Sequence, residues 1–370
     1  MIIGVVKEIK NHEYRVGLTP DNIKEYVKFG HTLLVESNAG LGANFTNEEY
    51  EMAGAIIIDS AKEVYEKSEM IIKVKEPLKE EYNYLRKGQI LYTYLHLAAN
   101  EELTKVLLEK EVIGVGYETI EDKSGHLPCL RPMSEIAGRL SIQQGAKYIE
   151  STYGGKGILL GGVPGVERGQ VVILGGGIVG TYAAKAAVGI DAQVTLLDVN
   201  LNRLSYLEDI FGASVTTMYS TEANVTKALK EADLVIGSVL IPGGKAPKLV
   251  RKEHLKLMKK GSVIVDIAID QGGCCETSKV TTHDNPVFIE DGVVHYCVGN
   301  MPGAVPYTST VALSNTTFKF ARLMANNGFE NAIKADEGLK NGVNIYGGKC
   351  TNKNVAVSHD IEYTEIETLI

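Results

Sequence analysis

The feature that most constrains this chain is a glycine-rich turn between an apolar strand pattern and a helix pattern. Gly175-Gly176-Gly177-Ile178-Val179-Gly180 matches G-x-G-x-x-G and directly follows the apolar run 171–174. In such a turn Gly175 permits the tight bend, Gly177 lets a diphosphate approach the backbone, and Gly180 lets the helix pack closely on the strand. The pattern predicts a doubly wound α/β domain with a dinucleotide at a helix N-terminus.

An acidic residue supports this reading and selects the nucleotide. Asp198 ends the next strand pattern, and a carboxylate there accepts hydrogen bonds from the ribose hydroxyls and repels a 2′-phosphate. We therefore expect NAD and not NADP. Arg203 argues the other way, because an arginine at this position can bind the 2′-phosphate of NADP. Ser220, at the end of the following strand pattern, is expected on the adenine side. A glycine turn without a ligand is the alternative.

Alternating strand and helix patterns extend over most of the chain and predict two parallel sheets. In the first series we expect strands at 2–6, 32–36, 55–58, 70–75, 89–95 and 112–117, with helices at 21–29, 47–53, 60–67 and 101–110. A helix over 132–152 leads to strands at 170–174, 193–198, 214–219, 234–237, 263–266 and 287–290, with helices at 178–189 and 200–211. After a helix at 308–326, the tail 331–370 is too short for its own core, so we expect it to return to the first domain.

Composition excludes several classes of protein. The 370 residues suit two domains, and a net charge of −8 without a dense basic run argues against nucleic-acid binding. The five widely spaced cysteines suggest buried free thiols in a reducing compartment. No apolar stretch is long enough for a membrane span, and the first residues lack a signal-peptide pattern, so we expect a cytoplasmic protein without membrane contact.

Four charged or titratable residues follow strand patterns and could carry chemistry. Arg15 follows the first strand and could pair with a carboxylate, or form a surface salt bridge. Lys75 ends a strand and could bind a carboxylate or keto oxygen, or be solvated. His96 closes the apolar run 90–95 and suits proton transfer, although a satisfied core histidine is the alternative. Asp270 follows the apolar run 263–269, where it could instead cap a helix.

Several segments together resemble bacterial L-alanine dehydrogenases, of the alanine dehydrogenase and transhydrogenase α-subunit family. The resemblance runs through the whole chain. It rests on Gly4–Lys10 with Glu13–Val16, Lys73–Pro77, Tyr94–Ala98, Arg131–Glu135, Asp266–Gly273 and Asn300–Pro306.

The resemblance implies reversible oxidative deamination of L-alanine by NAD to pyruvate, ammonium and NADH. It also implies two Rossmann-like domains with a cleft between them: a discontinuous substrate domain (1–128 and 307–370), an NAD domain (129–306), and a homohexamer. Arg15 and Lys75 would bind the substrate, and His96 and Asp270 would be the acid/base pair. Besides the glycine turn, the NAD contacts would be Ser134, Val179, Asp198, Arg203, Ser220, Val239, Leu240, Ile267, Ala268, Ile269, Asp270, Val298, Gly299, Asn300 and Met301.

Two positions depart from the family pattern. Lys279 stands where an arginine is often found near the adenine end. Leu323 and Asn327 stand where some relatives place a Glu and a His that bind magnesium, so we expect no metal.

Other functions keep the same fold. The alternatives are amination of glyoxylate to glycine, an opine-type reductase that joins a keto acid to a larger amine, the NAD-binding subunit of a transhydrogenase, and a nucleotide-sensing regulator without catalysis. Close packing around Tyr94, Met133 and Met301 would favour a side chain near the size of a methyl group, although one methylene changes affinity by only about 1–3 kcal/mol.

Overall fold

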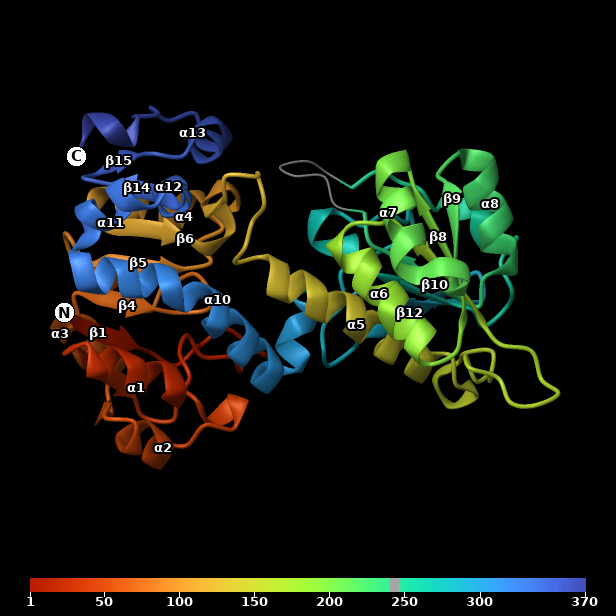
Figure 1. The fold of residues 1–370 in the computed structure, drawn as a ribbon, viewed down its shortest axis with the longest axis horizontal. Helices are drawn as coiled ribbons and strands as arrows, with labels where there is room; N and C mark the ends of the chain where they lie inside the picture. Colours follow the sequence, from red (N-terminus) through yellow and green to blue (C-terminus); the bar gives the residue numbers. More distant parts are fainter. Residues whose placement is uncertain (240–245) are drawn as a thin grey trace. The chain divides into compact units, whose positions relative to one another are not determined.

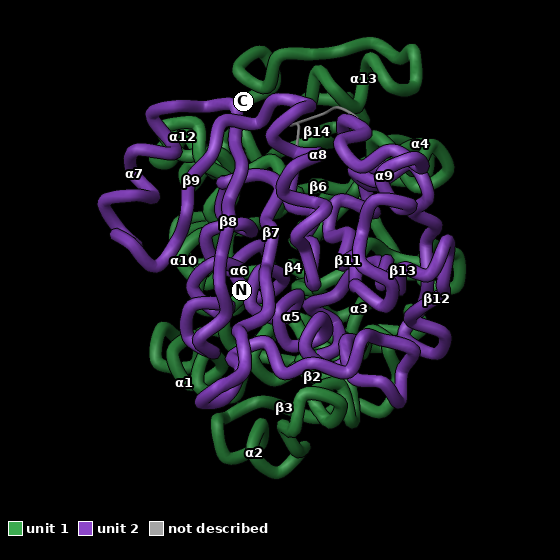
Figure 2. The backbone as a smooth tube through the Cα atoms, turned by 90° about the vertical axis from the view of Figure 1, so that its right-hand side faces the viewer, with its two compact units in different colours: residues 1–133, 305–370 green, residues 134–304 purple. Residues whose placement is uncertain are grey.

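Two sheets with the same central strand order organise the chain. The computed structural model describes residues 1–239 and 246–370. These form two compact units, unit 1 (residues 1–133 and 305–370) and unit 2 (residues 134–304), which Figure 1 and Figure 2 show. Helix α5 (Arg131–Tyr148) begins in unit 1 and continues in unit 2.

Unit 1 is built on an eight-stranded sheet of order β15-β14-β6-β5-β4-β1-β2-β3. Its strands are β1 (Ile2–Val5), β2 (Thr32–Glu36), β3 (Ile56–Ile58), β4 (Met70–Ile72), β5 (Ile90–Thr93), β6 (Ile113–Gly116), β14 (Val343–Tyr346) and β15 (Lys349–Cys350). Its helices are α1 (Pro20–Lys28), α2 (Asn47–Met52), α3 (Ala61–Lys67), α4 (Glu101–Glu109), α10 (Pro306–Asn327), α11 (Phe329–Ala335), α12 (Glu337–Asn341) and α13 (Lys353–His359). Strands β1 to β6 run parallel, β14 pairs antiparallel with β6, and the edge strand β15 pairs antiparallel with β14.

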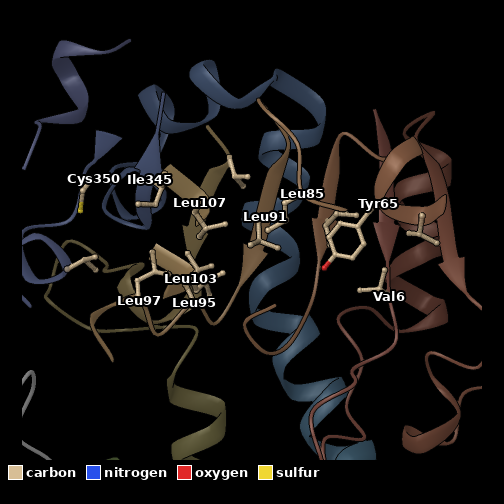
Figure 3. Close-up of a cluster of buried hydrophobic side chains, with 14 of the residues drawn as sticks. Val6, Tyr65, Leu85, Leu91, Leu95, Leu97, Leu103, Leu107, Ile345 and Cys350 are labelled. Carbon is tan, nitrogen blue, oxygen red and sulfur yellow. The ribbon is translucent and has the colours of Figure 1, made fainter. Parts of the chain in front are cut away.

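Strand β5 shows how unit 1 forms its two layers. Leu91 faces a cluster that includes Tyr65 of α3 and Ile345 of β14, as Figure 3 shows. The next residue, Tyr92, faces the opposite layer, where its hydroxyl donates to the Thr317 carbonyl of α10 over 3.1 Å. Because successive side chains of a strand alternate between faces, both faces of the sheet are buried. Ile345 shows that the C-terminal tail packs into the core of the first unit.

Unit 2 has the strand order of a doubly wound nucleotide-binding sheet, β12-β13-β11-β10-β7-β8-β9. Its strands are β7 (Gln170–Leu174), β8 (Gln193–Asp198), β9 (Val215–Tyr219), β10 (Leu234–Gly237), β11 (Val263–Asp266), β12 (Val287–Glu290) and β13 (Val293–Tyr296). Besides α5, its helices are α6 (Ile178–Gly189), α7 (Leu201–Phe211), α8 (Glu222–Glu231) and α9 (Lys252–Leu255). All neighbours are parallel except β12 on β13.

Both sheets reverse their winding direction at a central pair of strands. In unit 1 this pair is β1 and β4, and in unit 2 it is β7 and β10. Loops that leave such a pair diverge to opposite faces, so a crevice for ligands lies at the carboxyl ends of the strands. The residues that follow β1, β4, β7 and β10 therefore occupy the positions where such sheets bind ligands.

The predicted α/β class and parallel sheets are confirmed, and several element predictions were wrong. Helix α8 was not predicted, although Thr221 caps it by accepting a hydrogen bond from the Asn224 amide. Strands β13, β14 and β15 were also missed. The helix predicted to reach residue 152 ends at Tyr148, because a 3-10 turn at 151–153 and Gly154, with φ +87°, redirect the chain.

Two further expectations concern the cysteines and membrane spans. All five cysteines are buried and free, as expected. Within the described ranges, no helix is both long enough and apolar enough to cross a bilayer.

Candidate functional site

The glycine turn of unit 2 has the geometry that its sequence predicts. Gly175 has φ +103°, which a side chain would strain. A Cβ at Gly180 would lie 1.9 Å from the Gly175 carbonyl oxygen, so α6 packs against the turn at a distance that only glycine allows. A Cβ at Gly177, the N-cap of α6, would meet no atom within 4 Å. The first amides of α6 therefore lie beside open space.

Asp198 and Arg203 both contact the glycine turn. Asp198, at the end of β8, accepts hydrogen bonds from the amides of Gly176 over 2.6 Å and Asn200 over 2.8 Å. Arg203 donates through Nε to the Gly176 carbonyl and through Nη2 to the Thr181 hydroxyl, both over 2.6 Å. The Arg203 guanidinium, which could have bound a 2′-phosphate, is thus hydrogen-bonded to the glycine turn and to Thr181.

Neighbouring strands bring further predicted contacts to the same edge. The Ser220 amide donates to the Asp198 carbonyl, and Val239 lies next to Gly175, 3.1 Å from the place of a Cβ there. The Ser238 hydroxyl, which the sequence did not single out, donates to the Gly175 carbonyl over 2.9 Å. Leu240 lies outside the described residues.

The remaining predicted nucleotide contacts lie in α5 and in two turns of unit 2. Ser134 is the first residue of unit 2 and is half-buried. Ile267, Ala268 and Ile269 form the 3-10 turn η7 (Ile267–Gln271) with Asp270, while Val298, Gly299, Asn300 and Met301 lead into the 3-10 turn η8 (Met301–Ala304).

Asp270 and Gly299 lie close together, whereas the Lys279 side chain extends toward β12. A Cβ at Gly299 would be 3.0 Å from the Asp270 carboxylate, so the two turns meet at this residue. Asp270 is exposed and lies in η7, not at a strand end as predicted, because β11 ends at Asp266. Lys279 reaches Glu290 of the edge strand β12 over 3.8 Å, at the sheet edge opposite β9. The structure therefore does not bring Lys279 together with Asp198 and Ser220.

In unit 1, Arg15 is buried and paired with a carboxylate of its own segment. Its Nε donates to Glu13 Oε1 over 2.7 Å, its Nη2 lies 2.5 Å from Glu13 Oε2, and its Nη1 lies 3.1 Å from Met133 Sδ. Burial alone would lower the pKa of Arg15, but the bond to Glu13 raises it above its ordinary value. The bidentate edge that the sequence suggested for a substrate carboxylate is thus engaged by Glu13, and the surface salt bridge alternative is wrong.

Lys75 differs from its neighbour Lys73 in its electrostatic surroundings. Lys73 is fully buried between Glu81, at 2.8 Å, and Glu8, at 3.2 Å. Lys75 Nζ forms no ion pair with any described residue, and burial together with the nearby Arg15 lowers its pKa. Its backbone amide donates to Glu8 over 3.1 Å, and so does the amide of Val74 over 2.6 Å. Glu76 and Glu13 lie near enough to act on its charge, but no described residue pairs with its ammonium, which can therefore bind a small anion.

His96 lies on a strained segment beyond β5 and is held by two carboxylates. It has φ 49° and ψ 34°, an αL conformation that costs a non-glycine residue of the order of 1–3 kcal/mol. Glu118 accepts the amides of Leu95 and His96, the latter over 2.6 Å. Glu76 accepts the imidazole Nδ1 over 3.0 Å. The histidine is exposed, not at the end of a buried strand, because β5 ends at Thr93.

Sequence reasoning missed the carboxylates that organise this edge of unit 1, namely Glu8, Glu13, Glu76, Glu81 and Glu118. Their partners are as many as 67 residues apart in the chain, so no local spacing reveals them. The one local signal was Glu13, two residues before Arg15. In the described ranges, no three His, Cys, Asp or Glu residues are grouped to hold a metal ion.

Comparisons with known proteins agree with this arrangement. The N-terminal domain of the family described as Alanine dehydrogenase/PNT matches residues 4–137, and its C-terminal domain matches residues 141–353. An alanine dehydrogenase of Methanococcus maripaludis is 57% identical over 368 residues, 99% of each chain. An alanine dehydrogenase of Staphylococcus haemolyticus is 54% identical and covers 99% of this chain and 98% of its own.

Solved structures give the same result. A structure named L-alanine dehydrogenase superposes with a TM-score of 0.95 at 50% identity, covering 97% of this chain and 99% of the other. A transhydrogenase from Sinorhizobium meliloti, at 23% identity and a TM-score of 0.84 over 95% of this chain and all of its own, shares the fold. With both family domains matched in order and full-length relatives above half identity, this chain belongs to the alanine dehydrogenase/PNT family.

Proposed function

We propose that this protein is an NAD-dependent L-alanine dehydrogenase. It converts L-alanine, NAD⁺ and water reversibly to pyruvate, ammonium, NADH and a proton. The observation that carries the proposal is the half-buried Lys75, whose ammonium pairs with no described residue. It lies near Arg15 and is followed by Glu76, the partner of His96, in a chain more than half identical to alanine dehydrogenases. An amino-acid substrate requires a positively charged group that binds its carboxylate and, beside it, an imidazole that can transfer a proton.

Unit 2 would hold the nucleotide and unit 1 the substrate. The turn at Gly175–Gly180 would bind the diphosphate, and Asp198 would bind the adenosine ribose, which favours NAD over NADP. When bound, the nicotinamide supplies the acceptor for the α-hydrogen of the amino acid. The other contacts expected from the family pattern complete the site, with Lys279 the weakest among them because of its place at β12.

The residues of unit 1 would bind and orient the substrate. Lys75, supported by Arg15, holds the carboxylate of L-alanine. His96 accepts a proton from the water that adds to the substrate after its oxidation, and Asp270 of unit 2 orients that water. The reverse direction uses the same groups with their protons exchanged. By the same family resemblance, the proposal includes a homohexamer in the cytoplasm, which light scattering of the purified protein and fractionation of the cells would test.

The test is a spectrophotometric assay of the purified protein. With L-alanine and NAD and no added partner, NADH should accumulate. Glycine tests the glyoxylate alternative, larger amino acids test the opine alternative, and NADP tests the nucleotide preference. His96→Ala should lower the rate by about 100-fold or more, as expected for the loss of a general base. If L-alanine gave no NADH, or if His96→Ala kept the rate and its pH dependence, the proposal would be wrong.

A further inference from the structure

We propose that Glu76 is a positioning residue that fixes the tautomer and direction of the His96 imidazole, so that Nε2 and not Nδ1 acts on the substrate. The inference rests on the proposed function for its meaning in catalysis, but its structural part stands on the contacts of two side chains. Glu76 touches no reacting atom in this scheme and acts through His96.

The hydrogen bond between His96 and Glu76 determines which ring nitrogen carries the proton. His96 Nδ1 lies 3.0 Å from Glu76 Oε2. An ionised carboxylate can only accept hydrogen bonds, so Nδ1 must carry the proton. A neutral imidazole with its proton on Nδ1 has its lone pair on Nε2. No described residue is hydrogen-bonded to Nε2, which leaves that atom available to a substrate.

The Glu76 carboxylate is held in place by a second partner and is charged. Glu76 is largely buried, and its other oxygen, Oε1, is bonded to Lys10 Nζ over 2.6 Å. Burial alone would raise the pKa of Glu76, but its bonds to His96 and Lys10 hold that pKa well below the ordinary value. Both oxygens therefore have assigned partners, and the carboxylate remains an acceptor throughout the working pH range.

The face of the His96 ring and the His96 backbone are also held by neighbouring residues. The Tyr94 ring stacks on it at a centroid distance of 5.9 Å and an angle of 24°. The Tyr94 hydroxyl donates to the Cys129 carbonyl over 2.7 Å, which anchors that ring in unit 1. Glu118 holds the αL backbone through two amides. With backbone and ring face fixed by these contacts, the bond to Glu76 sets which nitrogen faces outward.

Several charged groups contribute to the behaviour of this imidazole. Glu76 and Glu118 are its negative neighbours, while Lys10 and Lys75 act on it through Glu76. Removal of the Glu76 charge takes away the counter-charge nearest to an imidazolium. The protonated form of His96 is then less stable, so its loss of a proton shifts to lower pH.

The experiment compares Glu76→Gln with a matched surface control. Glu102→Gln removes an exposed carboxylate that pairs with Lys79 over 2.7 Å and contacts nothing in the site. Glu76→Gln should lower kcat/KM for L-alanine by roughly 10- to 100-fold, as outer partners of functional histidines do, and move the acid limb of the pH profile to lower pH. Glu102→Gln should keep the wild-type values. Glu76→Asp, which retains the charge, should recover part of kcat and the wild-type pH limb.

A second readout does not depend on turnover. Diethyl pyrocarbonate acylates neutral imidazole, and peptide mass spectrometry follows the His96 peptide alone. In Glu76→Gln the pH midpoint of this modification should fall, and in Glu102→Gln it should stay. If Glu76→Gln failed to fold, the same two readouts on Lys10→Met would replace it. This variant frees one Glu76 oxygen but keeps the Glu76 charge, so it should show at most a few-fold loss of kcat/KM and no shift of the acid limb to lower pH.

The outcomes separate the two proposals. An unchanged midpoint and unchanged kcat/KM in Glu76→Gln would overturn the role of Glu76, as would a loss in Lys10→Met as large as that expected for Glu76→Gln. If the wild-type protein formed no NADH from L-alanine, the proposed function would fail, while a lowered modification midpoint in Glu76→Gln would still support the positioning of His96.

Discussion

Replacing Gly180 or Gly177 of the same turn by alanine should have different effects on stability and on nucleotide binding. At Gly180 the new Cβ would lie 1.9 Å from the Gly175 carbonyl oxygen, about 1.5 Å short of the 3.4 Å at which ordinary contact begins. The turn or α6 must shift by a comparable distance. Overpacking of this kind costs about 1–3 kcal/mol, and a displaced helix N-terminus should also weaken nucleotide binding.

At Gly177 the protein alone has room for the methyl group. Its Cβ would meet no atom within 4 Å, and its φ of −63° suits alanine. The free energy of unfolding should therefore change by no more than about 0.5 kcal/mol. The methyl group would nevertheless occupy the space that a diphosphate needs. Loss of one or two charge-assisted hydrogen bonds, at about 1.5–3 kcal/mol each, would raise the Kd for NADH by roughly 10- to 10,000-fold.

The assay measures unfolding in urea and NADH binding by fluorescence for both variants. Gly189→Ala, at the other end of α6 with no atom within 4 Å of its Cβ, is the matched control. It should leave the Kd unchanged and leave the stability equal or slightly higher, because alanine is the better helix former. If Gly177→Ala lost as much stability as Gly180→Ala, or if it bound NADH like the wild type, the assignment of the two glycines would be refuted.

Three further predictions follow from charges in the two units. Lys73→Met should destabilise the protein by about 3–5 kcal/mol at neutral pH, because Glu8 and Glu81 would remain buried without a counter-charge. Burial already raises the pKa of Glu8, so the loss of stability in urea unfolding should shrink toward acid pH as Glu8 takes up a proton. Burial and Arg15 lower the pKa of Lys75 below the ordinary lysine value of 10.5. The KM for L-alanine should therefore already rise with increasing pH below pH 10.5. Initial rates measured over a series of alkaline pH values would show no such rise if Lys75 did not bind the carboxylate. Asp198→Ala should raise kcat/KM for NADP by roughly 10- to 100-fold while lowering it for NAD, and an unchanged NAD-to-NADP ratio would contradict the role of this carboxylate.

The sequence was sufficient where function imposes a local backbone geometry. Strand 170–174, the glycine turn, helix 178–189 and strand 193–198 were predicted with the bounds that the structure has. Apolar runs, a helix start and glycines with assigned conformations are all properties of neighbouring residues. Arg15, Lys75, His96 and Asp270 could be named as candidates because they follow strand patterns, and their roles stay predictions.

Tertiary structure decided everything that depends on partners distant in the chain. Whether Arg15 is exposed or buried depends on how the rest of unit 1 packs around it. Which of Lys73 and Lys75 is held in ion pairs, and which nitrogen of His96 faces outward, depend on carboxylates from other segments. The sheet order places the ends of β1, β4 and β5 side by side, and only then do Glu8, Glu76 and Glu118 reach their targets. Spacing along a chain records which residues are neighbours on one element, whereas charge, burial and hydrogen bonding are set by neighbours in space.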